Sequence, residues 1–252
     1  MLKVRVIPTL LYKEVGLVKG IGFNSWRRVD TVLPAIKVYN MREVDELILL
    51  DIDANSKGTD PDYESIRDFS KECFVPFCVG GGINNIEQIK LLLRNGADKV
   101  AINSAAYDNI SLISEAAALF GSQCIVASID CKLIDGEYHC FSYSGTKDTG
   151  VILSDWAQRL EMAGAGEILI TSIENDGAMV GYDINMIKTV SEVVHIPVIA
   201  SGGAGNYEDM RKAIIDGGAS AVAAASIFHF TEQTPKEAKE YLAEKGIPTR
   251  LN

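Results

Sequence analysis

The stretch Val75-Pro-Phe-Cys-Val-Gly-Gly-Gly-Ile83 decides the fold, because the chain repeats it as Ile196-Pro-Val-Ile-Ala-Ser-Gly-Gly-Ala204. In each copy a hydrophobic residue and a proline precede a short apolar run, which ends in glycines. The copies begin at residues 75 and 196, an offset of 121, and the same offset relates the stretch 46–53 to the stretch 167–174. Solenoid repeats run at roughly 20–50 residues, so this period indicates a domain made of two similar halves.

The glycines of the repeat point to a binding function. A short apolar run is typical of a buried parallel strand, and glycines after it let a ligand approach the backbone. Free backbone N–H groups at the start of a helix bind phosphate. A tight turn between strand and helix is the alternative interpretation of one such cluster. Two copies, each backed by a further strand ending in Ser104 or Ser226, favour two phosphate sites related by a pseudo-twofold axis.

Eight apolar runs alternate with amphipathic stretches, such as 86–94 and 153–163, in which Ser154 is a candidate helix cap. This alternation predicts an α/β fold, a single (β/α)8 TIM barrel over residues 1–252 with half-barrels of about 1–121 and 122–252. An open doubly wound sheet would leave the repeat unexplained. The predicted strands are Val4–Leu11, Glu46–Ile52, Val75–Val79, Lys99–Ile102, Cys124–Ile129, Glu167–Thr171, Pro197–Ala200 and Ala221–Ala224.

Composition narrows the class of protein. The net charge of −10 argues against nucleic acid as a partner, so local groups must hold any anionic ligand. No apolar stretch approaches the roughly 20 residues that cross a bilayer, and the N-terminus lacks the apolar run of a signal peptide. The five cysteines form no C-x-x-C pair. We therefore expect a cytoplasmic protein with reduced thiols, no membrane partner, and neither a metal site nor an organic cofactor.

Two segments, 12–28 and 132–150, are longer than most connections between a strand and a helix. Both follow predicted strands at the end of the barrel where active sites lie. Connections of this length are often functional lids, whereas a surface hairpin without a role is the alternative, and it fits 132–150 better. Lys19, in the first segment, is a candidate phosphate-binding or lid-closing cation, and a solvated loop lysine is the alternative.

The repeat, together with Ala-Ser-Gly-Gly-Ala-Gly205 and Ser-Ile-Phe-His-Phe230, resembles the HisF family from about residue 3 to the C-terminus. HisF is the cyclase subunit of imidazole glycerol phosphate synthase, a doubled (β/α)8 barrel with two phosphate sites. The resemblance implies a heterodimer with a HisH-like glutaminase. Ammonia from that partner would enter the bottom of the barrel and meet a bisphosphorylated ribulosyl precursor at the top.

The resemblance also implies roles for individual residues. A first anion site comprises Gly82, Asn103 and Ser104, and a second comprises Asp176, Gly177, Gly203, Ala225 and Ser226. Asp98 matches a position at the glutaminase contact. A charge ring of Arg5, Glu46, Lys99 and Glu167 matches the family's ammonia gate. Each of these four lies at the start of a predicted strand, so a ring that only stabilises the barrel is the alternative.

The catalytic residues depart from the family pattern. HisF uses an aspartate at the end of strand 1 and a second at the end of strand 5. Asp130 matches the second, but Leu11 occupies the first position. A leucine cannot transfer a proton, and one positioned proton-transfer group typically contributes about 10²–10⁴-fold in rate. Asp130 and Lys19 remain the candidate catalytic residues, and the chain's own lyase and cyclase activity is in doubt.

Three functions follow. Thr9-Leu-Leu-Tyr-Lys-Glu14 resembles a HisF-like branch from surface-polysaccharide gene clusters. That branch implies a subunit that activates a HisH-like glutaminase and channels ammonia for acetamidino-group formation on a sugar, with a separate amidotransferase as a further partner. The first alternative is the histidine-pathway cyclase, which forms imidazole glycerol phosphate and AICAR. The second alternative is a catalytically silent scaffold.

Overall fold

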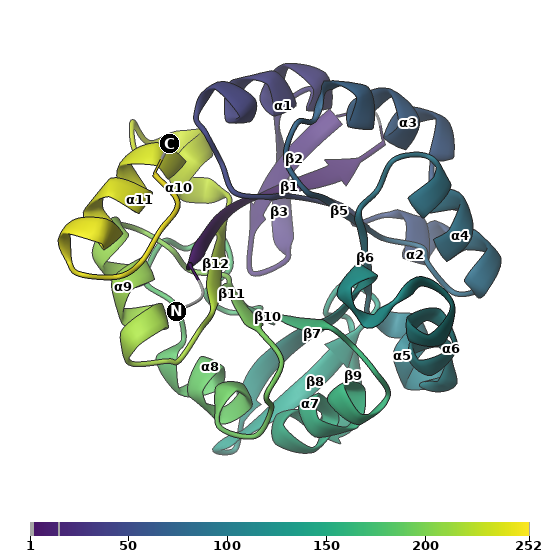
Figure 1. Cartoon of the computed structure of the whole chain (residues 1–252). Helices are drawn as coiled ribbons and strands as arrows, with labels where there is room; N and C mark the ends of the chain where they lie inside the picture. Colours follow the sequence, from purple (N-terminus) through teal and green to yellow (C-terminus); the bar gives the residue numbers. More distant parts are fainter. Residues whose placement is uncertain (1–2, 15, 252) are drawn as a thin grey trace.

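Eight parallel strands close into a barrel in the computed structural model, which describes residues 3–14 and 16–251 (Figure 1). Each strand pairs with the next, and β12 pairs with β1, so the sheet has no open edge within the barrel. The barrel strands are β1 (Arg5–Lys13), β4 (Leu47–Asp51), β5 (Phe77–Gly80), β6 (Lys99–Ile102), β7 (Ile125–Ile134), β10 (Glu167–Ser172), β11 (Val198–Ser201) and β12 (Ala221–Ala224). The predicted barrel fold is confirmed. Its predicted ends, residues 1 and 252, lie outside the described residues.

Helices surround the barrel on the outside (Figure 1). They are α1 (Val32–Met41), α2 (Ala54–Lys57), α3 (Tyr63–Glu72), α4 (Ile86–Arg94), α5 (Ser104–Asp108), α6 (Ser111–Phe120), the 3₁₀ turn η1 (Ser122–Cys124), α7 (Leu153–Met162), α8 (Ile184–Ser191), α9 (Tyr207–Ile215), α10 (Ser226–Phe230) and α11 (Pro235–Glu244). The predicted cap Ser154 is wrong, because α7 starts at Leu153 and Ile152 is its N-cap. Among the described helices, none is long and apolar enough to cross a bilayer.

The repeated prolines lie immediately before their strands. Proline has no N–H to give to a sheet, so it is tolerated at a strand's beginning. Its carbonyl is still available: Pro76 accepts from the N–H of Leu47 at 2.9 Å, and Pro197 accepts from the N–H of Ile168 at 2.9 Å. The two bonds occupy equivalent positions in the two halves and fix the register of β4 against β5 and of β10 against β11.

The apolar side chains form two layers. The larger layer fills the space between the strands and the helices. The smaller one fills the inside of the barrel and consists of Ile7, Ile48, Cys78, Ala101, Val126, Leu169, Ile199, Ala221 and Ala223. All five cysteines are free. The inside of the barrel is thus an apolar core between its two ends.

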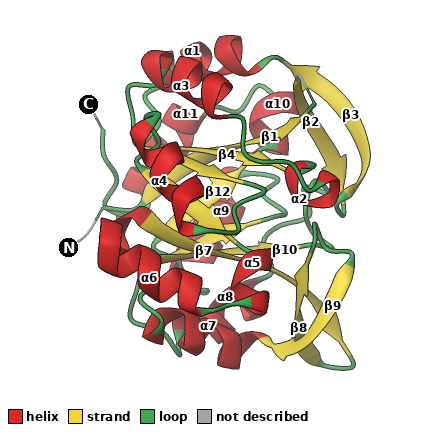
Figure 2. Cartoon of the chain, turned by 90° about the vertical axis from the view of Figure 1, so that its right-hand side faces the viewer, coloured by secondary structure: helices red, strands yellow, loops and turns green. Residues whose placement is uncertain are grey.

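The two long connections are β-hairpins that extend the barrel at one end (Figure 2). β2 (Gly16–Ile21) and β3 (Asn24–Asp30) form the first hairpin, and β8 (Glu137–Ser142) and β9 (Lys147–Ile152) form the second. Each continues antiparallel from its barrel strand, β1 or β7. Both tips come together over the barrel end, because a Cβ placed on Gly145 would lie 3.0 Å from a ring carbon of Phe23.

Candidate functional site

A pocket opens at the carboxyl ends of the barrel strands, beneath the two hairpins. It is lined by every residue predicted for the two anion sites, and by Leu11, Lys19 and Asp130. Leu11, Leu50, Phe23 and Trp26 contribute apolar walls. The pocket therefore gathers residues from both halves of the chain, which is where (β/α)8 barrels carry their active sites.

Strand register shows that Leu11 and Asp130 occupy equivalent places. Leu11 pairs with Leu50 across β1 and β4, and Asp130 pairs with Thr171 across β7 and β10. Leu50 and Thr171 are themselves related by the 121-residue offset. Leu11 and Asp130 are both almost fully buried, each 9% exposed. At this pair of equivalent positions the pocket thus has a carboxylate in one half and a hydrocarbon in the other, and Asp51 also lines it from the first half.

Asp130 has the electrostatic character of a proton-transfer group. Burial raises the pKa of its carboxyl to about 7, the charge of Asp176 adds to the rise, and a hydrogen bond from Asn103 opposes it. That bond runs from the Asn103 Nδ2 to the Asp130 Oδ2 at 2.8 Å. A carboxyl whose pKa lies near neutrality exists in both protonation states at working pH, as general acid–base chemistry requires.

Lys19 joins the first hairpin to the loop after β10. Its ammonium lies 2.7 and 2.6 Å from the two carboxylate oxygens of Asp176, and the lysine is only 3% exposed. The N–H of Gly22 donates to the carbonyl of Asp176 at 2.8 Å. The hairpin is thus held over the pocket by a buried ion pair and a backbone bond. Among the described residues that line the pocket, Lys19 is the only one with a cationic side chain.

The glycines of the repeat are required by close packing. Gly203 has φ +110°, and a Cβ there would lie 2.1 Å from the carbonyl oxygen of Gly181. Gly82 has φ +70°, and its Cβ would lie 2.9 Å from both the Ala54 Cβ and the Thr59 carbonyl oxygen. Any side chain would therefore force these turns apart. The same turns place backbone amides beside the pocket.

Several buried polar atoms in the pocket lack a protein partner. Within the described residues, these are the Thr9 Oγ1, the Asn103 Oδ1 and the Ser226 Oγ. Leaving a buried polar atom unpaired costs free energy, so their convergence on one cavity favours a polar ligand there. Thr9 was missed from the sequence, as were Asn55 and Tyr143, which donate to the Ser104 hydroxyl, and Ser144, whose hydroxyl donates to the carbonyl of Ile52. The repeat carried a signal for Asn55, since the offset pairs it with Asp176.

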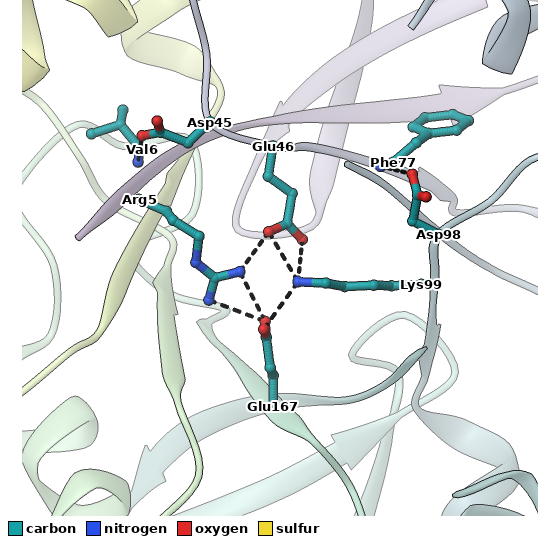
Figure 3. A network of polar contacts seen from close by, with 8 residues as sticks. All are labelled: Arg5, Val6, Asp45, Glu46, Phe77, Asp98, Lys99 and Glu167. Carbon is teal, nitrogen blue, oxygen red and sulfur yellow. Dashed lines mark hydrogen bonds and ion pairs between the residues drawn. The ribbon is translucent and has the colours of Figure 1, made fainter. Parts of the chain in front are cut away.

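The charge ring closes the opposite end of the barrel (Figure 3). Lys99 Nζ lies 3.0 Å from both carboxylate oxygens of Glu46 and 3.0 Å from one oxygen of Glu167. Arg5 bonds both glutamates from the other side. Burial lowers the pKa of Arg5, but the charges of Glu167 and Glu46 outweigh it, so the net shift is upward. Each cation contacts both anions, which gives an alternating ring without net charge.

Asp98 lies beside this ring on the same end of the barrel (Figure 3). It is exposed, and one of its carboxylate oxygens accepts from the backbone N–H of Phe77 at 2.8 Å. Asp45 does the same for the N–H of Val6 at 2.9 Å. Asp98 therefore has a structural bond as well as an open face, and its predicted contact with a partner stays a prediction.

Comparison with known proteins gives matches over the whole chain. The sequence model of the family described as "Histidine biosynthesis protein" matches residues 5–234. The chain is 46% identical over 251 residues to the "Imidazole glycerol phosphate synthase subunit HisF" of Natranaerobius thermophilus, with 100% of both chains covered. It is 45% identical over 251 residues to the subunit of that name from Chlorobaculum tepidum, again with 100% of both covered. The subunit from Caulobacter vibrioides is 45% identical over 254 residues, covering 100% of this chain and 98% of the relative.

Proposed function

Because the chain belongs to the family of histidine biosynthesis proteins and matches HisF subunits from end to end, we propose that it is the HisF-type subunit of a glutamine amidotransferase. In this proposal a HisH-like glutaminase docks at the end of the barrel that carries the charge ring and Asp98. Ammonia passes the ring and the apolar barrel interior, and it reacts in the pocket at the other end. The observation that carries the proposal is that the charge ring lies at one end of the barrel and the pocket lined by the predicted phosphate-binding residues lies at the other.

The names of the relatives support imidazole glycerol phosphate synthesis as the reaction. In this version the two anion sites hold the two ends of a bisphosphorylated substrate, and Asp130 transfers protons between them. Lys19 moves from Asp176 to a phosphate as the first hairpin closes. An uncharged interior suits the passage of neutral ammonia, because a bare ammonium ion would have to lose its hydration.

Leu11 favours a second candidate. With a hydrocarbon opposite Asp130, the pocket has no proton-transfer group at the position equivalent to Asp130, although Asp51 at the end of β4 also lines it. A subunit that conducts ammonia for acetamidino-group formation on a surface-polysaccharide sugar, with a separate amidotransferase, does not require that group. The names of the relatives support the histidine version over this one.

The decisive experiment combines this chain with a HisH-like glutaminase and measures three rates. The rate of glutamine hydrolysis with and without the chain tests whether the chain activates the glutaminase. An unchanged rate would favour the catalytically silent scaffold. Conversion of the bisphosphorylated precursor, with ammonium salt supplied directly, tests the cyclase. The variant Leu11→Asp is assayed in parallel. We expect turnover of the parent to be about 10²–10⁴-fold below that of an ordinary enzyme, and to rise in Leu11→Asp. If the parent turns over at about 10 s⁻¹, a common enzyme value, Leu11 does not limit the cyclase reaction. The histidine-pathway function would then be the only candidate left.

A further inference from the structure

The tip of the second hairpin reaches across the pocket to the first anion site. The backbone N–H of Tyr143 donates to the Ser104 Oγ at 3.0 Å, and the Ser144 Oγ donates to the carbonyl of Ile52 at 3.1 Å. Ser104 and Ser144 both line the pocket. A hairpin of the second half-barrel therefore covers the anion site of the first half.

The tip adopts a backbone conformation that its residues disfavour. Tyr143 has φ +51° and Ser144 has φ +54°, and both carry side chains. Residues other than glycine seldom occupy the left-handed region. Strain of this kind persists where surrounding contacts enforce it, and it is concentrated at functional sites. Here the tip is held by the two bonds to Ser104 and Ile52, and by the turn's own bonds from the N–H and hydroxyl of Thr146 to the carbonyl of Tyr143.

The hydroxyl of Ser104 is held in one orientation. It accepts from the Asn55 Nδ2 at 2.8 Å and from the Tyr143 N–H at 3.0 Å. A serine hydroxyl has two lone pairs and one hydrogen, so both lone pairs are occupied and the hydrogen remains. Ser104 donates this hydrogen to no other group in the described ranges, and the pocket lies beside it. A donor fixed in this way needs no reorientation when an anion arrives.

We propose that Asn55 and Tyr143 are positioning residues that aim the Ser104 hydroxyl at an anion in the first site. The second hairpin is then a working part of that site. This inference rests on the phosphate sites of the proposed function. The two sites use different groups. Asn55 and Asp176 occupy equivalent positions under the 121-residue offset. The first site therefore has the neutral donor Asn55, whereas the second has the ion pair of Lys19 and Asp176. Each hairpin also serves the site of the opposite half.

The test uses inorganic phosphate, measured by isothermal titration on the whole chain. A Ser226→Ala background weakens the second site, so that binding reports the first. In this background we expect Ser104→Ala to weaken phosphate binding by roughly 10- to 100-fold, as for a bond to a charged group. Asn55→Ala and Ser144→Ala should each weaken it by roughly 3- to 10-fold. Glu137→Ala, at an exposed position on the same hairpin, is the matched control and should change nothing.

Coupling between the variants separates positioning from general support. Once Ser104 is alanine, adding Asn55→Ala or Ser144→Ala should have no further effect on binding, and melting points without phosphate should stay together. Additive losses, or full binding by Ser104→Ala, would overturn the inference. If the variants are non-additive in phosphate binding as expected, but no ammonia is transferred from a glutaminase, only the proposed function is contradicted. Intact transfer without the coupling would count against this inference alone.

Discussion

The charge ring makes a quantitative prediction through Lys99. Lys99→Met keeps the length of the side chain and removes its charge, which leaves two carboxylates against Arg5 alone. Lys99 is 14% exposed and Glu46 only 1%, so water cannot compensate the excess negative charge. Removing one partner of a buried pair typically costs about 3–5 kcal/mol. Arg5 still contacts both glutamates, so we expect the lower end, a loss of about 3 kcal/mol in the free energy of unfolding.

That loss can be measured and tested against a neutral variant. For a chain of this length, about 3 kcal/mol corresponds to a melting point lower by roughly 6–12 °C. The double variant Lys99→Met/Glu46→Gln restores a ring without net charge, and it should be more stable than Lys99→Met although it carries two changes. Urea and thermal unfolding give both comparisons. A double variant less stable than the single one, or a loss below about 0.5 kcal/mol for Lys99→Met, would refute the coupled ring.

The same variants test the gate. With a glutaminase partner present, the amount of product formed per glutamine hydrolysed should fall in Lys99→Met at temperatures where the fold is intact. The physical reason is that the ring no longer closes symmetrically, so ammonia and water exchange at the barrel end. A lowered melting point with an unchanged ratio would leave the ring a stabilising role only.

Three further predictions concern the pocket. Asp130 keeps its proton up to about pH 7 in the folded state but loses it near pH 4 in the unfolded state. Between these values the folded state binds one more proton than the unfolded state, so the free energy of unfolding falls as pH rises from about 4 to about 7. Asp130→Asn removes that fall, and urea unfolding at pH 5 and pH 8 should show the variant gaining about 3 kcal/mol on the parent over this range; a constant difference would contradict the raised pKa. Lys19→Met should speed amide hydrogen exchange in β2 and β3 while leaving β8 and β9 unchanged, because only the first hairpin loses its ion pair; equal exchange would refute the clamp. Ser226→Ala should weaken phosphate binding at the second site by roughly 10-fold or more, and unchanged titration at both sites would contradict the assignment of Ser226.

The barrel could be predicted from the sequence because its signals are local or repeated. Each predicted strand agrees with an observed one to within a few residues, apart from β7, which continues into the second hairpin. Apolar runs and the prolines before them are short-range features, and the 121-residue offset tied them into one closed sheet. The residues predicted for the anion sites also meet in one pocket, since the carboxyl ends of parallel strands share one end of a barrel.

The hairpins and their contacts could not be predicted in the same way. The segments 12–28 and 132–150 looked like long connections, because glycines and charged residues interrupt their strand patterns. The bond from Tyr143 to Ser104 joins residues 39 apart, and the pair Lys19–Asp176 joins residues 157 apart. No local pattern encodes such pairings. For the second hairpin, the alternative of a surface hairpin without a role was the one that fitted better than for the first; in the structure its tip contacts Ser104, which lines the pocket.

The register that sets Leu11 opposite Asp130 has a consequence for how a ligand is oriented. A pocket with full twofold symmetry accepts a ligand bearing a phosphate at each end in two equivalent ways. Only one of them can be productive, which wastes half of the bound population, worth about 0.4 kcal/mol as RT ln 2. A carboxylate on one side and a leucine on the other break this symmetry, because a polar edge of the ligand meets a carboxylate at Asp130 in one orientation and a hydrocarbon at Leu11 in the other. The repeated halves thus supply two predicted anchors, and the unlike pair Leu11 and Asp130, together with the unlike pair Asn55 and Asp176, decides which end is which.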